Sequence, residues 1–249
     1  DRSADGIGIV DVLEQRVVNV LTAGTDPEQV AVSADGTRVF VANEDAALAS
    51  VVEIDTGRVI AELPVGGEPE GVTRSPNGRW VYITSENDSQ VSVIDTEALE
   101  IAAVFDVGAR PRSSTFSPDS TRAYVTAENG SNVSVVDTSD HTVIETIALS
   151  GENVRPMDAK VSPDGSRLYV STGRGRTVVV IDTTTHEIVG SVEVGTRPWG
   201  IALTADGRYL YAANGPSNDV SVVDTETLAV VATVAAGERP WGVAIVEGP

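Results

Sequence analysis

The residues best suited to chemistry flank a proline that recurs at Pro27, Pro69, Pro111, Pro156, Pro198 and Pro240. Acids flank the first two prolines, whereas arginine or tryptophan flanks most of the others. Guanidinium groups bind carboxylates and phosphates through paired hydrogen bonds, and tryptophan rings offer a surface for stacking. The sequence therefore predicts a site for an anionic ligand, and a carboxylated aromatic such as a quinone cofactor would suit it. The predicted ligand-binding residues are Arg110, Arg112, Arg155, Arg197, Trp199, Arg239, Trp241, Arg174 and Arg176. The alternative is that these arginines pair with neighbouring acids and that the tryptophans plug a central channel.

A second set of polar residues follows an apolar stretch in three consecutive repeats. Glu44, Glu86 and Glu128 occupy the same slot, with asparagines beside them. Carboxylate and amide oxygens are ligands that Ca²⁺ prefers. These glutamates are therefore the candidate metal ligands. The alternative is a set of hydrated loops whose carboxylates bind local backbone amides.

The two histidines exclude several classes of enzyme. His141 and His186 both fall in a turn that is expected on the side opposite the prolines, and the chain has no cysteine. A Ser-His-Asp triad needs a histidine beside its nucleophile, and haem or copper sites need histidine ligands at the mouth. We therefore expect no catalytic residue of these kinds, and metal-assisted carboxylate chemistry of the lactonase type is what remains.

The prolines mark a repeat of about 42 residues that must position these side chains. Each unit holds a short apolar run, a turn such as "SPDG" (162–165), a second run such as "RLYVST" (167–172), and a third such as "VVVIDT" (178–183). A fourth run follows the Asp-Thr pair, whose aspartate is expected to cap a turn. The second and third runs are apolar at nearly every position, which indicates sheets covered on both faces. Stacked four-stranded sheets of this kind predict an all-β fold, the β-propeller.

The two ends of the chain match different parts of the same repeat. Residues 1–24 resemble the third and fourth strands, and residues 239–249 resemble the first. We expect them to share a closing blade within a single domain, around whole repeats at 25–66, 67–108, 109–153, 154–195 and 196–238. This gives six blades, or seven if a long segment precedes Asp1.

Charge and composition limit the partners. The formal net charge is −20, with 37 acidic against 17 basic residues. Nucleic acids and anionic membranes both require a basic surface, so neither is expected as a partner. No apolar run reaches the roughly 18–20 residues of a membrane span.

Several motifs resemble known propeller families. "LYVST", "VYITS", "VSVIDT" and the "SPDG" turns resemble the YVTN-type β-propeller repeats of extracytoplasmic bacterial and archaeal proteins. "GRGRTVVVID", "VGTRPWGIALTADGRYLYAANGPSNDVSVVDTETL" and "GERPWGVAI" are similar to the β-propeller family associated with PQQ-dependent catabolism. The resemblance implies a periplasmic or extracellular location beside a quinoprotein oxidation system. It makes PQQ a candidate ligand beside Ca²⁺.

Three functions are consistent with these observations. The first is a non-enzymatic binding or scaffold propeller that holds an anionic small molecule or a periplasmic protein on its arginines and tryptophans. The second is a metal-dependent hydrolase of the lactonase type. The third is a structural module of a surface layer.

Overall fold

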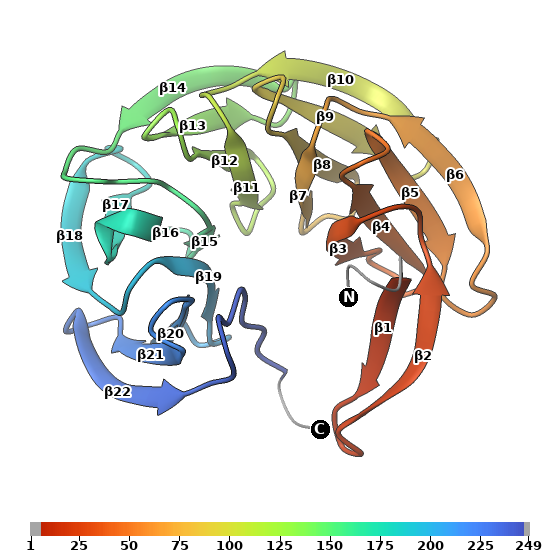
Figure 1. Cartoon of the computed structure of the whole chain (residues 1–249). Helices are drawn as coiled ribbons and strands as arrows, with labels where there is room; N and C mark the ends of the chain where they lie inside the picture. Colours follow the sequence, from red (N-terminus) through yellow and green to blue (C-terminus); the bar gives the residue numbers. More distant parts are fainter. Residues whose placement is uncertain (1–5, 247–249) are drawn as a thin grey trace. The chain divides into compact units, whose positions relative to one another are not determined.

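The computed structural model describes residues 6–246, almost entirely as β-strands and turns. By its internal contacts the chain divides into two compact units, residues 1–114 and residues 115–249, with the boundary inside strand β11. The described chain forms one two-stranded sheet and five four-stranded sheets, and in each sheet chain order is also spatial order (Figure 1). Within the described residues the only helical element is the 3₁₀ turn η1 (Gly173–Gly175).

The first unit contains a two-stranded sheet and two four-stranded sheets. The strands are β1 (Gly6–Asp11) and β2 (Arg16–Thr22); β3 (Pro27–Val32), β4 (Arg38–Asn43), β5 (Leu48–Glu53) and β6 (Val59–Pro64); and β7 (Pro69–Arg74), β8 (Trp80–Ser85), β9 (Gln90–Asp95) and β10 (Glu100–Asp106).

The second unit contains the sheet that β11 begins and two further four-stranded sheets. The strands are β11 (Pro111–Phe116), β12 (Arg122–Ala127), β13 (Asn132–Asp137) and β14 (Thr142–Ala148); β15 (Ala159–Val161), β16 (Arg167–Ser171), β17 (Thr177–Asp182) and β18 (Ile188–Glu193); and β19 (Pro198–Leu203), β20 (Tyr209–Asn214), β21 (Asp219–Asp224) and β22 (Ala229–Ala235).

The predicted fold class, an all-β propeller of four-stranded blades, is confirmed by these sheets. The boundaries of the repeats, the shared closing blade and the exact number of blades stay predictions. Residues 1–5 and 247–249 of that closing blade lie outside the described part of the chain, and residues 240–246 form no strand.

The core lies between neighbouring sheets because the two middle strands of each blade are buried on both faces. In β4 and β8 every residue after the first is buried, whereas the outer strands β2 and β22 are almost wholly exposed. Valine and isoleucine suit such pleated, crowded surfaces. Tyr169, for example, packs in one cluster with Ile201 and Leu210 of the following blade.

Paired side-chain hydrogen bonds fix the turns on one side of each blade. In the turn before β16, Asp164 accepts hydrogen bonds from the Ser162 hydroxyl at 2.5 Å and from the Ser166 N–H at 3.0 Å. In the turn after β21, Asp224 accepts from the N–H groups of Glu226 and Thr227, both at 3.0 Å. The Asp-Thr aspartates Asp95, Asp137, Asp182 and Asp224 therefore cap turns, as the sequence predicts. The same prediction for Asp55 is wrong, because Glu53 holds the equivalent slot: it pairs with Arg38 as Asp95 pairs with Trp80, and it accepts the Thr56 hydroxyl at 2.9 Å.

A different set of hydroxyl groups links one blade to the next near the repeated prolines. Thr84, Thr126 and Ser171 occupy equivalent slots late in β8, β12 and β16. Their hydroxyls donate to the backbone carbonyls of Arg112, Met157 and Trp199 at 3.3, 3.0 and 2.7 Å. These bonds hold the residue after each proline against the preceding blade.

No helix among residues 6–246 has the length and apolar character to cross a membrane.

Candidate functional site

Five of the six loops that carry the repeated prolines share one backbone conformation. Asp26, Glu68, Arg110, Arg197 and Arg239 all have positive φ, between 48° and 56°. Such a conformation is uncommon for residues other than glycine and costs about 1–3 kcal/mol, so it persists only where the surroundings impose it. It aims the carbonyl groups of Asp26 and Glu68 at the loop after the second strand, where the N–H groups of Glu44 and Glu86 donate to them at 3.0 Å. We call this end of each blade the proline-loop side.

In the first unit, two of the predicted arginines bind acids. Arg112 is 7% exposed, and its guanidinium lies 2.8 Å from a carboxylate oxygen of Glu70 and also pairs with Glu86. Arg110 Nε lies 2.7 Å from the other carboxylate oxygen of Glu86. Arg110 and Arg112 therefore follow the alternative in which rim arginines pair with neighbouring acids. Glu86, a candidate metal ligand, is held between two arginines.

Glu70 carries an unusual pKa. Burial is the largest cause, and it raises the pKa of Glu70 from 4.5 to about 7, because the charged form is poorly solvated there. Arg112 opposes the shift, while the nearby charges of Glu28, Glu86 and Glu44 add to it. The carboxyl group of Glu70 therefore exchanges its proton near neutral pH.

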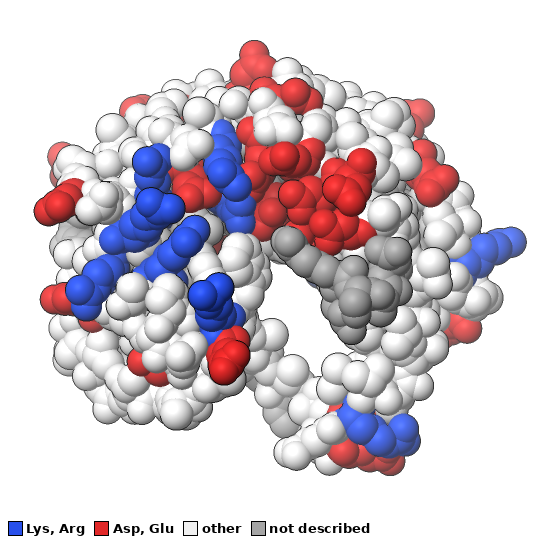
Figure 2. All heavy atoms as spheres, in the orientation of Figure 1, with Lys and Arg blue, Asp and Glu red and all other residues white. Residues whose placement is uncertain are grey.

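The first unit also contains a set of three carboxylates that could hold a metal ion. Asp26, Glu28 and Glu44 each offer one oxygen, and these oxygens lie within 4.8 Å of one another. Figure 2 shows acidic side chains gathered on this face of the first unit. Glu44 thus meets Asp26 and Glu28 of its own repeat. Glu86 meets arginines, and Glu128 lies in the second unit, 8% exposed.

In the second unit, the two predicted tryptophans lie against each other. The ring centroids of Trp199 and Trp241 are 4.2 Å apart, with the planes tilted by 43°. Trp199 is 9% exposed and Trp241 is 45% exposed. The guanidinium of Arg197 lies 5.3 Å from the centroid of the Trp199 ring, within the range of a cation–π contact. Figure 2 shows basic side chains clustered on the visible face of this unit.

Arg197 and Trp199 border a cleft of about 420 Å³, which we call the Arg/Trp cleft. It is lined by Arg197, Trp199, Pro216, Asn218 and Arg239. The Asn218 side chain accepts a hydrogen bond of 2.9 Å from the Arg239 N–H, which fixes the loop that carries Arg239. Within the described chain the Arg239 guanidinium forms no ion pair. The cleft therefore offers the Arg197 guanidinium, which stacks on the Trp199 ring, and the Arg239 guanidinium, which forms no ion pair with an acid of the described chain.

Glycine at position 215 allows Trp199 to occupy this wall. A β-carbon on Gly215 would lie 2.2 Å from Cζ3 of the Trp199 ring, which is far inside contact distance. The indole N–H of Trp199 is buried and has no hydrogen-bond partner in the described chain. Pattern analysis missed Gly215, Pro216 and Asn218. The "NGPSND" loop (214–219) could have suggested them, because it follows the second strand of a repeat, where loops share the side of the prolines.

The remaining predicted arginines lie on the same unit but outside the cleft lining. Arg155 donates a hydrogen bond of 2.8 Å to the Asn129 side chain. Arg174 lies in η1, and Arg176, which ends that turn with a φ of 62°, has its guanidinium 3.8 Å from Glu193. His141 and His186 lie in the turns before β14 and β18, as predicted, and burial lowers the pKa of His141.

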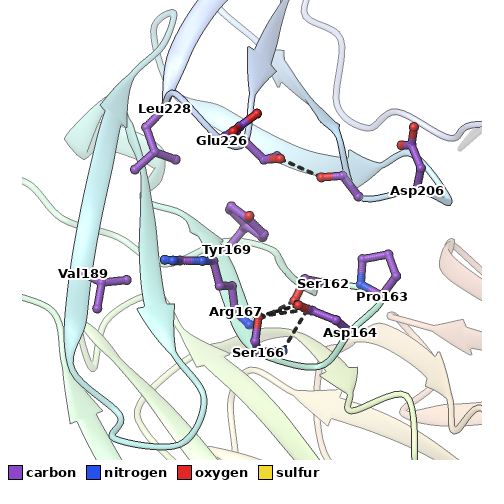
Figure 3. Close-up of a pocket in the computed structure, with 12 residues that line it drawn as sticks. Ser162, Pro163, Asp164, Ser166, Arg167, Tyr169, Val189, Asp206, Glu226 and Leu228 are labelled. Atoms are coloured by element: carbon purple, nitrogen blue, oxygen red, sulfur yellow. Dashed lines mark hydrogen bonds between the residues drawn. The ribbon is translucent and has the colours of Figure 1, made fainter.

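A second cavity of about 550 Å³ opens at the opposite, turn-bearing side of the second unit, between the blade of β15–β18 and that of β19–β22 (Figure 3). Its lining is polar, with Asp164, Asp206 and Glu226 among it. Arg167 extends between Val189 and Tyr169 in this view. Asp164 is already bonded to Ser162 and Ser166, and Glu226 lies 2.6 Å from Arg208. Since its acids already have partners, this cavity is the weaker candidate for a ligand site.

Two family models match the sequence, each over just over half of the chain. The model "Lactonase, 7-bladed beta-propeller" matches residues 99–236, and the model "Cytochrome D1 heme domain" matches residues 1–127. A comparison with curated proteins finds no match.

Many solved structures share the fold. Hydrazine synthase of Kuenenia stuttgartiensis aligns with a TM-score of 0.88 at 23% identity, over 97% of this chain and 83% of that one. A putative 6-phosphogluconolactonase of Bacteroides fragilis aligns with a TM-score of 0.79 at 20% identity, over 97% and 80%. A protein of unknown function from Desulfotomaculum acetoxidans aligns with a TM-score of 0.83 at 15% identity, over 97% and 81%. At these identities the likeness shows the fold alone. From the family models, the chain belongs to the β-propeller families of the seven-bladed lactonases, over residues 99–236, and of the cytochrome D1 haem domain, over residues 1–127.

Proposed function

We propose that this propeller binds a small organic anion in the Arg/Trp cleft. The observation that carries the proposal is the pairing of two arginines with an aromatic wall around one cleft, in a chain whose net charge is −20. The Arg239 guanidinium forms no ion pair within the described chain, so its hydrogen-bond donors are available to an anion. Clustered positive charge in a concave site also attracts anions from solution.

The contrast with the first unit supports this choice. There, Arg110 and Arg112 are bound to Glu86 and Glu70, so an anion would have to displace a carboxylate. In the Arg/Trp cleft, Arg197 stacks on Trp199 and Arg239 has no such acid to lose. An anion would therefore bind at the cleft of the second unit and not among the acids of the first.

The chemistry of the cleft favours a planar anion. Trp199 supplies an aromatic wall that is extended by the half-exposed Trp241 ring packed against it, and the paired N–H donors of a guanidinium match a carboxylate. PQQ is a flat tricarboxylate of this class. Together with the resemblance of the "RPWG" repeats, this supports a binding protein that serves a periplasmic quinoprotein system. A protein partner that presents a carboxylate next to an aromatic side chain would meet the same requirements.

Tryptophan fluorescence tests the proposal directly. The chain has three tryptophans, and Trp80 lies in the first unit, so Trp80→Phe leaves only Trp199 and Trp241 as reporters. We expect PQQ and simple tricarboxylates to quench this variant saturably, and salt to weaken the binding by screening. Free tryptophan corrects for light absorbed by PQQ.

A matched pair of arginine variants separates binding at the cleft from a general charge effect. Arg239→Met removes one cleft guanidinium, and Arg58→Met removes the same charge from an exposed pair with Glu53 in the first unit. We expect Arg239→Met to weaken binding about tenfold or more, as for loss of a charge-assisted hydrogen bond, and Arg58→Met to leave it unchanged. Equal affinity in both variants would reject the cleft. No response to any anion would favour a purely structural role, such as a surface-layer module.

Lactone hydrolysis is the second candidate function. The lactonase family model favours it, as does the structural likeness to the putative 6-phosphogluconolactonase of Bacteroides fragilis. Asp26, Glu28 and Glu44 form an all-oxygen donor set that suits a divalent cation such as Ca²⁺, which would polarise a lactone carbonyl. Hydrolysis of a panel of sugar lactones, lost with a chelator and in Glu28→Gln, would support it. A protein that neither binds Ca²⁺ nor opens any lactone would remove it.

Haem binding has less support from the residues present. Residues 1–127, which match the cytochrome D1 haem-domain model, contain no histidine, cysteine or methionine. The two tyrosines of this segment, Tyr82 and Tyr124, are at most 2% exposed. Since haem iron is held by His, Cys, Met or Tyr, the described residues of this segment supply no accessible axial ligand. We therefore assign no haem to this site.

A further inference from the structure

The outermost strand of each blade has a free edge, and one of these strands differs from the others. Five of the six outer strands carry a charged residue: β2, β6, β10, β14 and β18. The sixth, β22, reads AVVATVA, with no charge and no proline, and all seven of its residues are exposed. Val231 and Val234 are each 55% exposed. Its only hydrogen-bonded neighbour within the described chain is β21.

Such an edge is open to pairing with another strand. Unpaired N–H and C=O groups along an edge form a template for a further strand, and proteins protect such edges with charges, prolines or bulges. A one-residue bulge is present in β22 at Val231, but the same bulge occurs in β18 at Val189. The bulge therefore does not explain why β22 alone lacks a charge.

The sequence of β22 is complementary to itself. In an antiparallel pair of two copies centred on Ala232, alanine faces alanine at positions 229 and 235 and valine faces valine at positions 230 and 234. The one unlike pair joins Val231 to Thr233, which are both β-branched and nearly equal in size. A charge anywhere in the strand would meet a neighbouring copy across the two-fold axis, and none is present. This is the pattern that a two-fold interface requires.

We propose that β22 pairs with β22 of a second copy of this chain to form a two-fold dimer. This inference is independent of the anion site and goes beyond the proposed function. A single added strand pair buries little area, so the dimer belongs to the weak class of interfaces. Each copy carries a net charge of −20, so long-range repulsion opposes association and salt strengthens it.

Sedimentation of the intact protein tests the dimer, over concentrations from about 10 µM to about 500 µM that bracket weak dissociation constants. We expect the weight-average mass to rise toward twice the monomer mass, and to rise further with salt. Val231→Lys should abolish the rise, because two lysines would meet near the axis. Val189→Lys is the matched control, since Val189 holds the same bulge position in β18 and is similarly exposed, at 47%. A monomer at every concentration, or equal effects of the two lysines, would overturn the proposal, as would growth beyond a dimer.

Cysteine cross-linking tests the register. The chain has no cysteine, so Ala232→Cys introduces a single thiol at the proposed axis. Directly opposed residues of an antiparallel pair have Cα atoms about 4.5–5.5 Å apart, within the range that a disulfide spans. We expect Ala232→Cys to form a disulfide-linked dimer on mild oxidation, and Ala103→Cys, at the equivalent position of β10, to remain monomeric. Equal cross-linking of both variants would contradict the register.

Discussion

Glu70 should make the stability of the first unit depend on pH in a direction unusual for a carboxyl group. Its pKa is raised from 4.5 to about 7, chiefly by burial, so the folded chain holds this proton more tightly than the unfolded chain. Stability is therefore greatest below pH 4.5 with respect to this group, and it falls as the pH rises through 7. The difference between the two pKa values corresponds to about 3 kcal/mol in the free energy of unfolding.

Glu70→Gln removes this titration while keeping an oxygen that can accept the Arg112 hydrogen bond. The variant should lose the pH dependence between about pH 5 and about pH 8, and at the higher pH it should be more stable than the wild type by up to about 3 kcal/mol. Glu97→Gln is the control, because Glu97 lies in the same blade with its side chain 83% exposed. Removing its charge should leave the pH dependence as it is.

Urea unfolding at the two pH values measures the effect. Fluorescence is read in a background that carries Trp199→Phe and Trp241→Phe, so that Trp80, the one tryptophan of the first unit, is the reporter. Aspartates with lowered pKa, such as Asp35 and Asp164 at about 2, lose their contribution only in strong acid and so do not overlap this window. A wild type and a Glu70→Gln variant with the same pH dependence would refute the assignment of a high pKa to Glu70.

Three further changes test other parts of the structure. Gly215→Ala should displace Trp199, because the added carbon would overlap its ring, and near-ultraviolet circular dichroism should lose the signal of the Trp199–Trp241 pair. Thr84→Val should lower the free energy of unfolding by about 1–3 kcal/mol in urea titrations, since it leaves the buried N–H of Gly71 without its acceptor. Asp224→Ala should cost about 1 kcal/mol by removing the turn cap, and a change within error would contradict its capping role.

The sequence predicted the blades because the repeat fixes local structure. The turn residues, the buried middle strands and the capping aspartates all depend on neighbours within about 20 positions, and these neighbours recur in every copy. The proline loop lies beside the loop after the second strand, and in the blade of β3–β6 the hydrogen bond from the Glu44 N–H to the Asp26 carbonyl joins the two loops.

The partners of the arginines could not be predicted in this way. Arg110 and Arg197 hold the same slot before a proline, yet Arg110 meets Glu86 and Arg197 meets Trp199. The difference arises from side chains of adjoining loops, at sequence distances that the repeat does not constrain. Arg155 differs again, because the repeat before it is three residues longer and its φ is not positive. The repeat therefore predicts the backbone position of a residue but not the contacts of its side chain.

The most direct test of the anion site is nuclear magnetic resonance of the protein labelled with ¹⁵N at its tryptophans. The three indole N–H groups give three signals. Trp199 lines the Arg/Trp cleft and Trp241 packs against Trp199, whereas Trp80 lies in the first unit beside Arg79. Titration with PQQ or a tricarboxylate should shift the signals of Trp199 and Trp241 saturably and leave that of Trp80 in place. Uniform shifts of all three signals, or none at saturating anion, would contradict binding at the cleft.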